Sequence, residues 1–269
     1  MSPLTAVVLG IVQGLTEFLP VSSSGHLILV RSFMGWDPEA PAWLAFDVAC
    51  HVGTVASVVA VFWKDLLRMV AALPSAISGT RLDALRIRLI VAGTVPVVVG
   101  GLLGGARIEH LVRIPVIVAV TLVLGALWML LAERLGSQTK REPQLRLSDA
   151  FLVGVAQAAA LVPGISRSGV TIGAGMLLGF ERAEIARFTF LLSVPAILAA
   201  AAKSGIELRH VGLSAADAQV FGIGLITSGL VGYAVVKYLL RFLTTHRLDV
   251  FVWYRLALAA AIGVWLAAR

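Results

Sequence analysis

The hydrophobic positions of this chain form long unbroken runs separated by short polar segments, a pattern typical of helices that cross a membrane. Six runs are long enough to cross a hydrocarbon core of about 30 Å. They cover residues 43–63, 89–106, 115–132, 188–202, 218–240 and 250–268. The strict polar–apolar alternation of barrel strands is absent, so we expect an all-α integral membrane protein.

Two further apolar stretches are interrupted. The first is cut by Pro-Val-Ser-Ser-Ser-Gly at residues 20–25, and the second by Pro-Gly-Ile-Ser-Arg-Ser-Gly at residues 163–169. After each cut the apolar pattern resumes for about two or three helical turns. A helix, a break and a shorter helix predict a re-entrant hairpin that enters and leaves on one side. Broken backbone at membrane depth is tolerated only where it lines a cavity or is buried in protein.

The two interrupted stretches resemble each other residue by residue. Gly10 aligns with Gly154, Gln13 with Gln157, Ser22 with Ser166, Ser24 with Ser168 and Gly25 with Gly169, without a gap. Only the first copy contains Glu17 and His26, and only the second contains Arg167. We expect two halves that supply different charges to one shared site, built to hold an anion.

The basic residues orient this arrangement. If loops 64–88, 133–147, 181–187 and 237–248 share a side, that side holds 14 Lys and Arg residues. The opposite side holds six, namely Arg31, Arg107, Arg113, Lys203, Arg209 and Arg269. Basic loops stay in the cytoplasm, so we expect both termini and the opening of the site on the periplasmic or extracellular side.

Each half then has one hairpin and three transmembrane helices, and an odd number of spans inverts the second half relative to the first. The sequence thus predicts two inverted-topology repeats whose broken tips meet inside the bilayer. We expect a single membrane domain over residues 1–269, with repeat one at 1–133, a linker at 134–147 and repeat two at 148–269.

Composition excludes a soluble protein. The 269 residues are 59% hydrophobic and 14% charged, against about 25% charged residues in a soluble domain. The net charge of +7 looks like that of a nucleic-acid-binding protein, but in a membrane protein it reflects cytoplasmic loops that face anionic lipid. We therefore expect the membrane as a partner and no nucleic acid.

The first break predicts where its helices end and begin. Gln13 and Glu17 are spaced i, i+4 and share one helix face. Pro20 lacks an N–H group and ends that helix. The next helix begins near His26, behind three serines that are good N-caps. These serines are Ser22, Ser23 and Ser24.

By the same logic the second break starts a helix near Val170, capped by Ser166 or Ser168. Unpaired N–H groups and the helix dipole make each helix start an anion site. Arg167 suits phosphate because its planar fork binds two phosphate oxygens. We expect the anion to contact Gln13, Ser22, Ser24, Gly25, Ser166, Ser168 and Gly169.

These residues also have plain structural interpretations. Glu17 and Arg167 could form an inert salt bridge, His26 could be a buried hydrogen-bond partner, and the serines could only cap helices. Ionisable groups at membrane depth are usually functional, so we favour a functional role for Glu17 and Arg167.

Three other polar residues receive the plain interpretation. Asp47 and His51 are spaced i, i+4 near the outer end of the first span. They could support the site indirectly or be merely interfacial, and we favour the interfacial interpretation. Gln157 we take as structural, holding a hairpin carbonyl.

At these motifs the chain resembles the bacitracin-resistance family, the undecaprenyl-pyrophosphate phosphatases of bacterial inner membranes. The family motif (E/Q)-x-x-x-E reads Gln13-Gly-Leu-Thr-Glu17 here and runs into P-V-S-S-x-G-H at residues 20–26. The motif P-G-x-S-R-S-G is matched in full at residues 163–169, and residues 179–195 are also similar to the family. The resemblance covers essentially the whole chain.

The resemblance implies removal of the terminal phosphate of undecaprenyl pyrophosphate, which regenerates the lipid carrier for cell-wall synthesis. It also implies that Glu17, His26 and Arg167 are essential, with a serine nearby. Many members have Glu where this chain has Gln13, so a two-carboxylate metal site is not available. We expect a divalent cation, Mg²⁺ or Ca²⁺, only as a counter-ion that accompanies the pyrophosphate.

The sequence leaves the mechanism open. Water or a serine, with Ser23 as first choice, attacks the phosphorus, and Glu17 or His26 accepts the proton. His26 could instead form a phosphoenzyme or protonate the leaving phosphate. The partner is a polyprenyl pyrophosphate lipid, and a homodimer is compatible with the sequence.

The competing class is a lipid-phosphate flippase or anion transporter, because inverted repeats with broken helices are a transporter architecture. A pure anion carrier gains nothing from a carboxylate placed against phosphate, so Glu17 beside His26 favours an enzyme.

Overall fold

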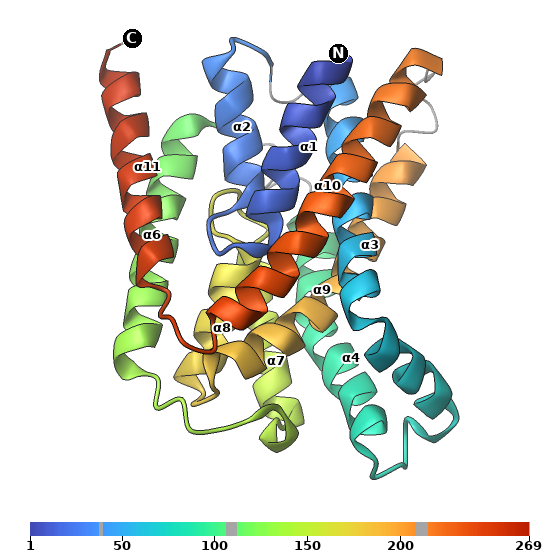
Figure 1. The fold of residues 1–269 in the computed structure, drawn as a ribbon. Coiled ribbons are helices and arrows are strands. Elements are labelled where there is room, and N and C mark those ends of the chain that lie inside the picture. Colours follow the sequence, from blue (N-terminus) through green and yellow to red (C-terminus); the bar gives the residue numbers. More distant parts are fainter. Residues whose placement is uncertain (38–39, 106–111, 208–214, 269) are drawn as a thin grey trace.

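The computed structural model describes residues 1–37, 40–105, 112–207 and 215–268. Over these residues the chain forms ten α-helices and no strand, which confirms the all-α class (Figure 1). The helices are α1 Pro3–Phe18, α2 Ser23–Phe33, α3 Pro41–Ala72, α4 Leu82–Gly100, α6 Pro115–Leu135, α7 Leu147–Ala159, α8 Arg167–Leu177, α9 Arg182–Glu207, α10 Ala215–Phe242 and α11 Asp249–Ala267. Four residues used in the sequence analysis lie outside the described ranges: Ala106, Arg107, Arg209 and Arg269.

Six stretches of the described residues have the length and hydropathy of membrane spans, as the apolar runs predict. They are Ala42–Ser75, Leu82–Gly104, Pro115–Leu135, Arg182–Ala202, Asp217–Phe242 and Asp249–Ala267. Three helices run well beyond the predicted apolar runs. α3 continues to Ala72 beyond a kink at Phe62, α4 begins at Leu82, and α9 begins at Arg182. The apolar helices α1 and α7 have 16 and 13 residues and are too short to span.

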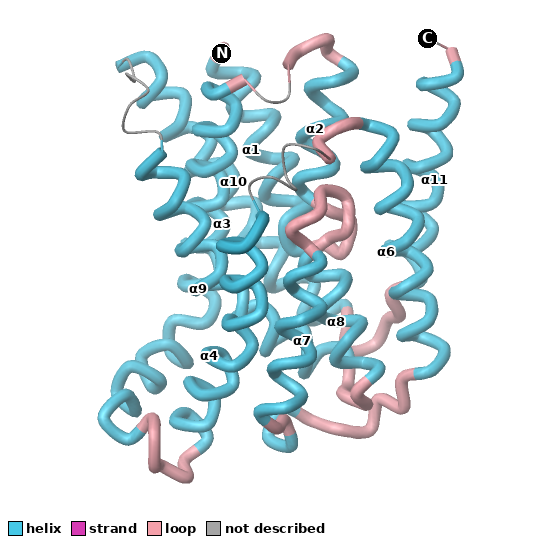
Figure 2. Tube along the Cα trace, turned by 180° about the vertical axis from the view of Figure 1, so that it is seen from behind, coloured by secondary structure: helices cyan, strands magenta, loops and turns pink. Residues whose placement is uncertain are grey.

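The two short helix pairs occupy opposite halves of the molecule. α1 and α2 lie in the half where the chain begins and α11 ends, whereas α7 and α8 lie in the other half, as both views show (Figures 1 and 2). The connections α3–α4, α6–α7, α8–α9 and α10–α11 lie toward the end opposite the start of α1. The four basic loops of the sequence therefore do share one side of the molecule.

The predicted linker at 134–147 is held in place by buried ion pairs. α6 runs into it as far as Leu135, and Glu142–Gln144 form a short 3-10 turn. Glu142 is 4% exposed and accepts hydrogen bonds from Arg86 of α4 at 2.7 and 2.9 Å. Arg182 of α9 forms a similar two-bond pair with Glu133 of α6. Such charge-assisted pairs fix both distance and orientation.

α10 packs closely along α3 and α1 because small residues line the contact. Ser57 Oγ donates to the carbonyl of Gly229 at 2.8 Å, and Ser228 Oγ donates to the carbonyl of Cys50 at 2.9 Å. A Cβ atom on Gly53 would clash with the α10 backbone and with Ser228 Oγ. The approach of these two helices therefore requires glycine at position 53.

We expect Gly53→Ala to destabilise the protein and Gly263→Ala to leave it as stable or more stable. A Cβ at Gly263 meets nothing within 4 Å, and alanine favours helix by about 1 kcal/mol over glycine. At position 53 the same methyl group overpacks a tight contact, at a cost of about 1–3 kcal/mol. Thermal unfolding of both variants in one detergent measures the difference, and equal Tm values would contradict the packing described for α3 and α10.

Candidate active site

Each helix break ends in a serine N-cap, as the repeat predicts. α2 begins after Ser22, with φ 76° and ψ 100°, and α8 begins after Ser166, with φ 74° and ψ 109°. A positive φ is uncommon for residues other than glycine and costs about 1–3 kcal/mol. The two copies of the motif therefore adopt the same strained local structure, which the surrounding contacts must maintain.

The cap hydroxyls bond within their own break. Ser22 Oγ accepts the N–H of Gly25 at 3.4 Å, and Ser166 Oγ accepts that of Gly169 at 3.2 Å. Ser24 Oγ lies 3.4 Å from Ser22 Oγ in the first break, and Ser168 Oγ lies 3.2 Å from Ser166 Oγ in the second. Both helix starts thus present hydroxyl groups together with first-turn N–H groups that lack intrahelical partners.

Glu17, at the end of α1, is the centre of the polar cluster. Its side chain is 5% exposed. Gln13 Nε2 donates to Glu17 Oε2 at 3.0 Å, and Ser23 Oγ donates to the same oxygen at 2.6 Å. His51 Nε2 of α3 lies 3.7 Å from Oε2, and Arg167 Nη1 of α8 lies 3.6 Å from Oε1. Residues from four helices, α1, α2, α3 and α8, therefore converge on one carboxylate.

Arg167 reaches this carboxylate from the other half of the chain. Its Nη1 atom is buried and has no hydrogen-bond partner, since 3.6 Å from Glu17 is beyond hydrogen-bonding distance. A buried donor without an acceptor costs free energy, and a phosphate oxygen would supply the acceptor. The side chain is 28% exposed, so a ligand can approach it.

The two breaks also touch each other directly. Ser168 Oγ donates to the carbonyl of Leu19 at 3.1 Å. A Cβ atom on Gly25 would lie 3.4 Å from the Cα atom of Gly164. The positive ends of the α2 and α8 dipoles are therefore neighbours, and together they favour an anion.

His26 makes its hydrogen bonds away from this cluster. Its Nδ1 is 2.7 Å from the carbonyl oxygen of Ser22, and its Nε2 is 2.7 Å from the hydroxyl of Tyr254 on α11. The two rings stack with centroids 5.7 Å apart. No hydrogen bond or ion pair within the described ranges joins His26 to Glu17 or Arg167. The structure thus brings together the candidate catalytic residues except the histidine.

Comparison with known proteins identifies the family. A family model described as bacitracin resistance protein BacA matches residues 6–261. This chain belongs to that family. An undecaprenyl-diphosphatase of Rubrobacter xylanophilus is 43% identical over 267 residues, which covers 98% of each chain. Another from Geobacter metallireducens is 43% identical over 270 residues, covering 99% of each chain.

Sequence reasoning missed one buried cation of this BacA-family site, Arg255 of α11. It is fully buried and donates four hydrogen bonds to backbone carbonyls, those of Pro20, Thr121, Leu122 and Gly164, at 3.3, 3.0, 3.0 and 2.8 Å. Pro20 and Gly164 belong to the two breaks, so Arg255 fastens both of them to α6. The signal in the sequence was an arginine inside the last apolar run, because ionisable residues within spans are usually functional.

Three residues differ from their plain interpretation. Asp47 forms a buried ion pair with Arg31 at 2.5 and 2.9 Å, which holds this part of α3 against α2. One turn later, His51 Nε2 lies 3.7 Å from Glu17 Oε2, so neither residue is merely interfacial. Gln157 is 1% exposed, yet neither atom of its amide has a hydrogen-bond partner. It therefore does not hold a hairpin carbonyl.

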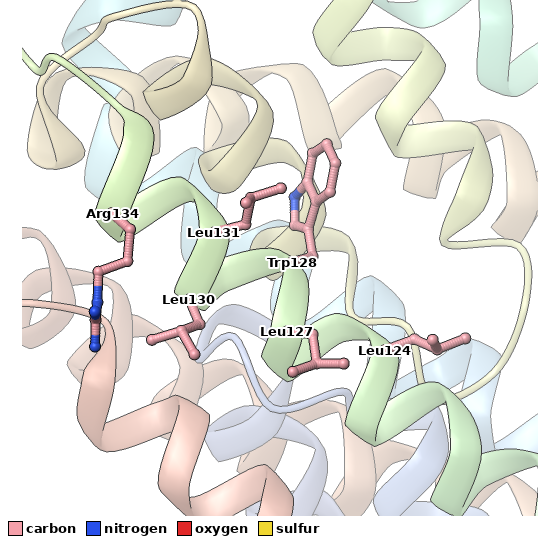
Figure 3. Close-up of a pocket in the computed structure, with 6 residues that line it drawn as sticks. All are labelled: Leu124, Leu127, Trp128, Leu130, Leu131 and Arg134. Carbon is pink, nitrogen blue, oxygen red and sulfur yellow. The ribbon is translucent and has the colours of Figure 1, made fainter.

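Two cavities differ sharply in size and chemistry. The one beside Glu17 measures about 10 Å³ and has polar lining from Glu17, Arg167, Ser168, Thr171, Thr189 and Ser193; it has room for about one water molecule. A cavity of about 540 Å³ lies along α6, lined by Leu124, Leu127, Trp128, Leu130, Leu131 and Arg134 (Figure 3). The large cavity contains none of the predicted site residues and has an apolar lining apart from Arg134, whereas Glu17, Arg167 and Ser168 line the small one.

We expect Arg255→Lys and Arg255→Met to be markedly less stable than the wild type. A lysine has one nitrogen and cannot serve four carbonyls, and each buried polar group left without a partner costs about 1–3 kcal/mol. The matched control is Arg134→Met, which removes an exposed arginine and should change stability by less than about 0.5 kcal/mol. Thermal unfolding in detergent measures all three, and an unchanged Tm for Arg255→Met would contradict its role in joining the breaks.

Proposed function

We propose that this chain hydrolyses undecaprenyl pyrophosphate to undecaprenyl phosphate and inorganic phosphate, the activity after which its relatives are named. The reaction recycles the lipid carrier for peptidoglycan and other cell-wall polymers, in line with the bacitracin resistance in the family's name. One observation carries the proposal. A serine hydroxyl donates to a buried carboxylate at 2.6 Å, beside a guanidinium atom that lacks a partner.

The pyrophosphate headgroup binds between the two helix starts, with its prenyl tail in the surrounding hydrocarbon. Phosphoryl transfer requires positioning and neutralisation of charge more than covalent chemistry. Arg167 clamps the phosphate oxygens, and the first-turn N–H groups of α2 and α8 add to the clamp. The remaining headgroup contacts come from Gln13, Ser22, Ser24, Gly25, Ser166, Ser168 and Gly169.

Ser23 is the attacking group in this proposal. Its Oγ attacks the terminal phosphorus while the bond from that phosphorus to the bridging oxygen breaks, and undecaprenyl phosphate leaves with the electron pair. The hydroxyl proton passes to Glu17, whose Oε2 already accepts it in a hydrogen bond. Water then hydrolyses the phosphoserine. In the simpler variant water attacks directly, and Ser23 only orients it.

We assign His26 to the leaving-group side. Its ring nitrogens contact the Ser22 carbonyl and Tyr254, so it is not the base that serves Ser23. In this proposal Nε2, once protonated, exchanges its contact with Tyr254 for the departing phosphate and supplies a hydrogen bond or a proton to it.

A divalent cation, Mg²⁺ or Ca²⁺, would accompany the pyrophosphate as its counter-ion. The described residues contain no group of three or more His, Cys, Asp or Glu side chains arranged to hold a metal. The oxygen atoms of Glu17, Gln13 and Ser23 would hold a cation that phosphate oxygens already coordinate, and Gln13 Oε1 is buried without a hydrogen-bond partner. When bound, the cation would neutralise negative charge on the phosphates.

We place the protein in the bacterial inner membrane with its site open to the periplasmic or extracellular side. The support is the excess of basic residues in the four loops that share one end, opposite the start of α1 and the end of α11. The opposite placement of the pairs α1–α2 and α7–α8 supports two inverted repeats in a single domain (Figure 1). Assembly as a homodimer remains part of this proposal.

We expect Glu17→Ala and Arg167→Ala to lose phosphate release by about 100-fold or more, since removal of one preorganised charge contact has effects of that size. If Ser23 is the nucleophile, Ser23→Ala loses at least as much. Ser32→Ala in the same helix and Arg134→Ala are the matched controls and should retain wild-type rates. The measurement is inorganic phosphate released from undecaprenyl pyrophosphate by purified protein in detergent.

The outcomes separate the schemes. Near-normal release by Glu17→Ala or Arg167→Ala would overturn the site, and strong residual release by Ser23→Ala would favour direct attack by water. A folded wild-type protein that releases no phosphate would favour the flippase or transporter, and lipid translocation in proteoliposomes would then be measured.

A further inference from the structure

A base that accepts a proton in a buried site must also lose it. Glu17 is 5% exposed, so water has little access to its oxygens. Gln13 and Ser23 approach it as hydrogen-bond donors, and Arg167 is a permanent cation that cannot accept a proton. Of the side chains that contact Glu17 in the described part of the chain, His51 alone is able to take a proton from it.

The tautomer of His51 is set by its own helix. Its Nδ1 is 2.7 Å from the carbonyl oxygen of Asp47, and a carbonyl oxygen only accepts hydrogen bonds, so Nδ1 carries a hydrogen. In the neutral ring Nε2 then has the free lone pair, and Nε2 is the atom that faces Glu17 Oε2 at 3.7 Å. This distance exceeds a hydrogen bond, as is common at catalytic contacts before substrate tightens them.

The remaining contacts hold His51 in position, and its ring is partly exposed at the protein surface. Asp47 is fixed by its buried pair with Arg31, whose guanidinium lies 4.9 Å from the centroid of the Trp43 ring. The His51 side chain is 27% exposed, against 5% for Glu17. The imidazole thus lies between a buried carboxylate and accessible surface.

We infer that His51 is the proton relay of Glu17, an inference that rests on the proposed phosphatase reaction. The proton moves from Ser23 Oγ, or from an attacking water, to Glu17 Oε2 and then to His51 Nε2. The ring becomes an imidazolium that keeps its Nδ1 hydrogen bond to Asp47 and faces a carboxylate that is again ionised. It then releases the proton to water, which returns both groups to their starting states.

Charged groups around the ring favour this direction of transfer. Glu17 from α1 stabilises the imidazolium, whereas the charge of Asp47 on α3 is largely compensated by Arg31 of α2. Arg167 of α8 lies on the Oε1 side of Glu17, and His51 lies on the Oε2 side. Arg167 and His51 therefore approach different oxygens of the same carboxylate. His51 acts through Glu17 and is a positioning and relay residue.

The test compares His51→Gln and His51→Ala with the wild type, and with His246→Gln as the matched control, because His246 is an exposed histidine in the α10–α11 connection. Phosphate release from undecaprenyl pyrophosphate gives kcat and KM for each. We expect kcat to fall at least tenfold in both His51 variants, with KM within twofold of the wild type. Added imidazole should restore part of the rate of His51→Ala and none of the rate of Glu17→Ala.

Other results would overturn the relay. A kcat of His51→Gln within twofold of the wild type excludes it. A loss accompanied by a lower Tm or a raised KM, without rescue by imidazole, assigns His51 a purely structural role. Wild-type protein assayed in parallel distinguishes the two proposals. If the wild type releases no phosphate, the proposed function is wrong. If the wild type and the His51 variants are all active, only the relay is wrong.

Discussion

A buried guanidinium is the interaction on which the rest of this structure depends. Interrupted helices at membrane depth expose carbonyl groups that neither water nor helix can satisfy. Arg255 supplies donors to Pro20 in one break and to Gly164 in the other, and Thr121 adds a hydroxyl to the carbonyl of Pro163 at 2.8 Å. Without these donors the carbonyl groups of both breaks would be buried without hydrogen-bond partners, which would destabilise the folded state. The contact between the two breaks would be weaker as well.

The contact between the two breaks gives the site a positive electrostatic potential. Two helix starts and Arg167 make the region favourable for anions, and Arg255 adds a buried positive charge behind them. Within this positive environment Glu17 is a single carboxylate surrounded by donors from three directions. In the proposed reaction this carboxylate is the base, and the surrounding donors favour the ionised form that a base requires before it takes a proton.

Some parts of this arrangement could be predicted from the sequence and others could not. The serines of the two breaks could be named as cap candidates, Ser22 as one of three and Ser166 as one of two, because capping is local and the repeat displays it twice. Glu17 and Arg167 could be paired because each is a charge in an apolar motif. The contacts of Arg255 and His51 could not be predicted, because hydrophobic runs show where helices lie and not which faces meet. The packing of α3 against α1 brings His51 to Glu17, and the packing of α11 against α6 brings Arg255 to the breaks.

Because of the strained serine caps, the free energy needed to order the two helix starts is spent when the protein folds and not when lipid binds. A residue with φ near 75° is disfavoured by its own backbone, and its neighbours hold it there when the chain folds. Both helix starts are therefore set before any lipid arrives. A flexible loop would have to order itself around the headgroup and would weaken binding by that entropy. Here the scaffold is preorganised, so contacts with the headgroup can contribute to affinity and to stabilisation of the transferring phosphate.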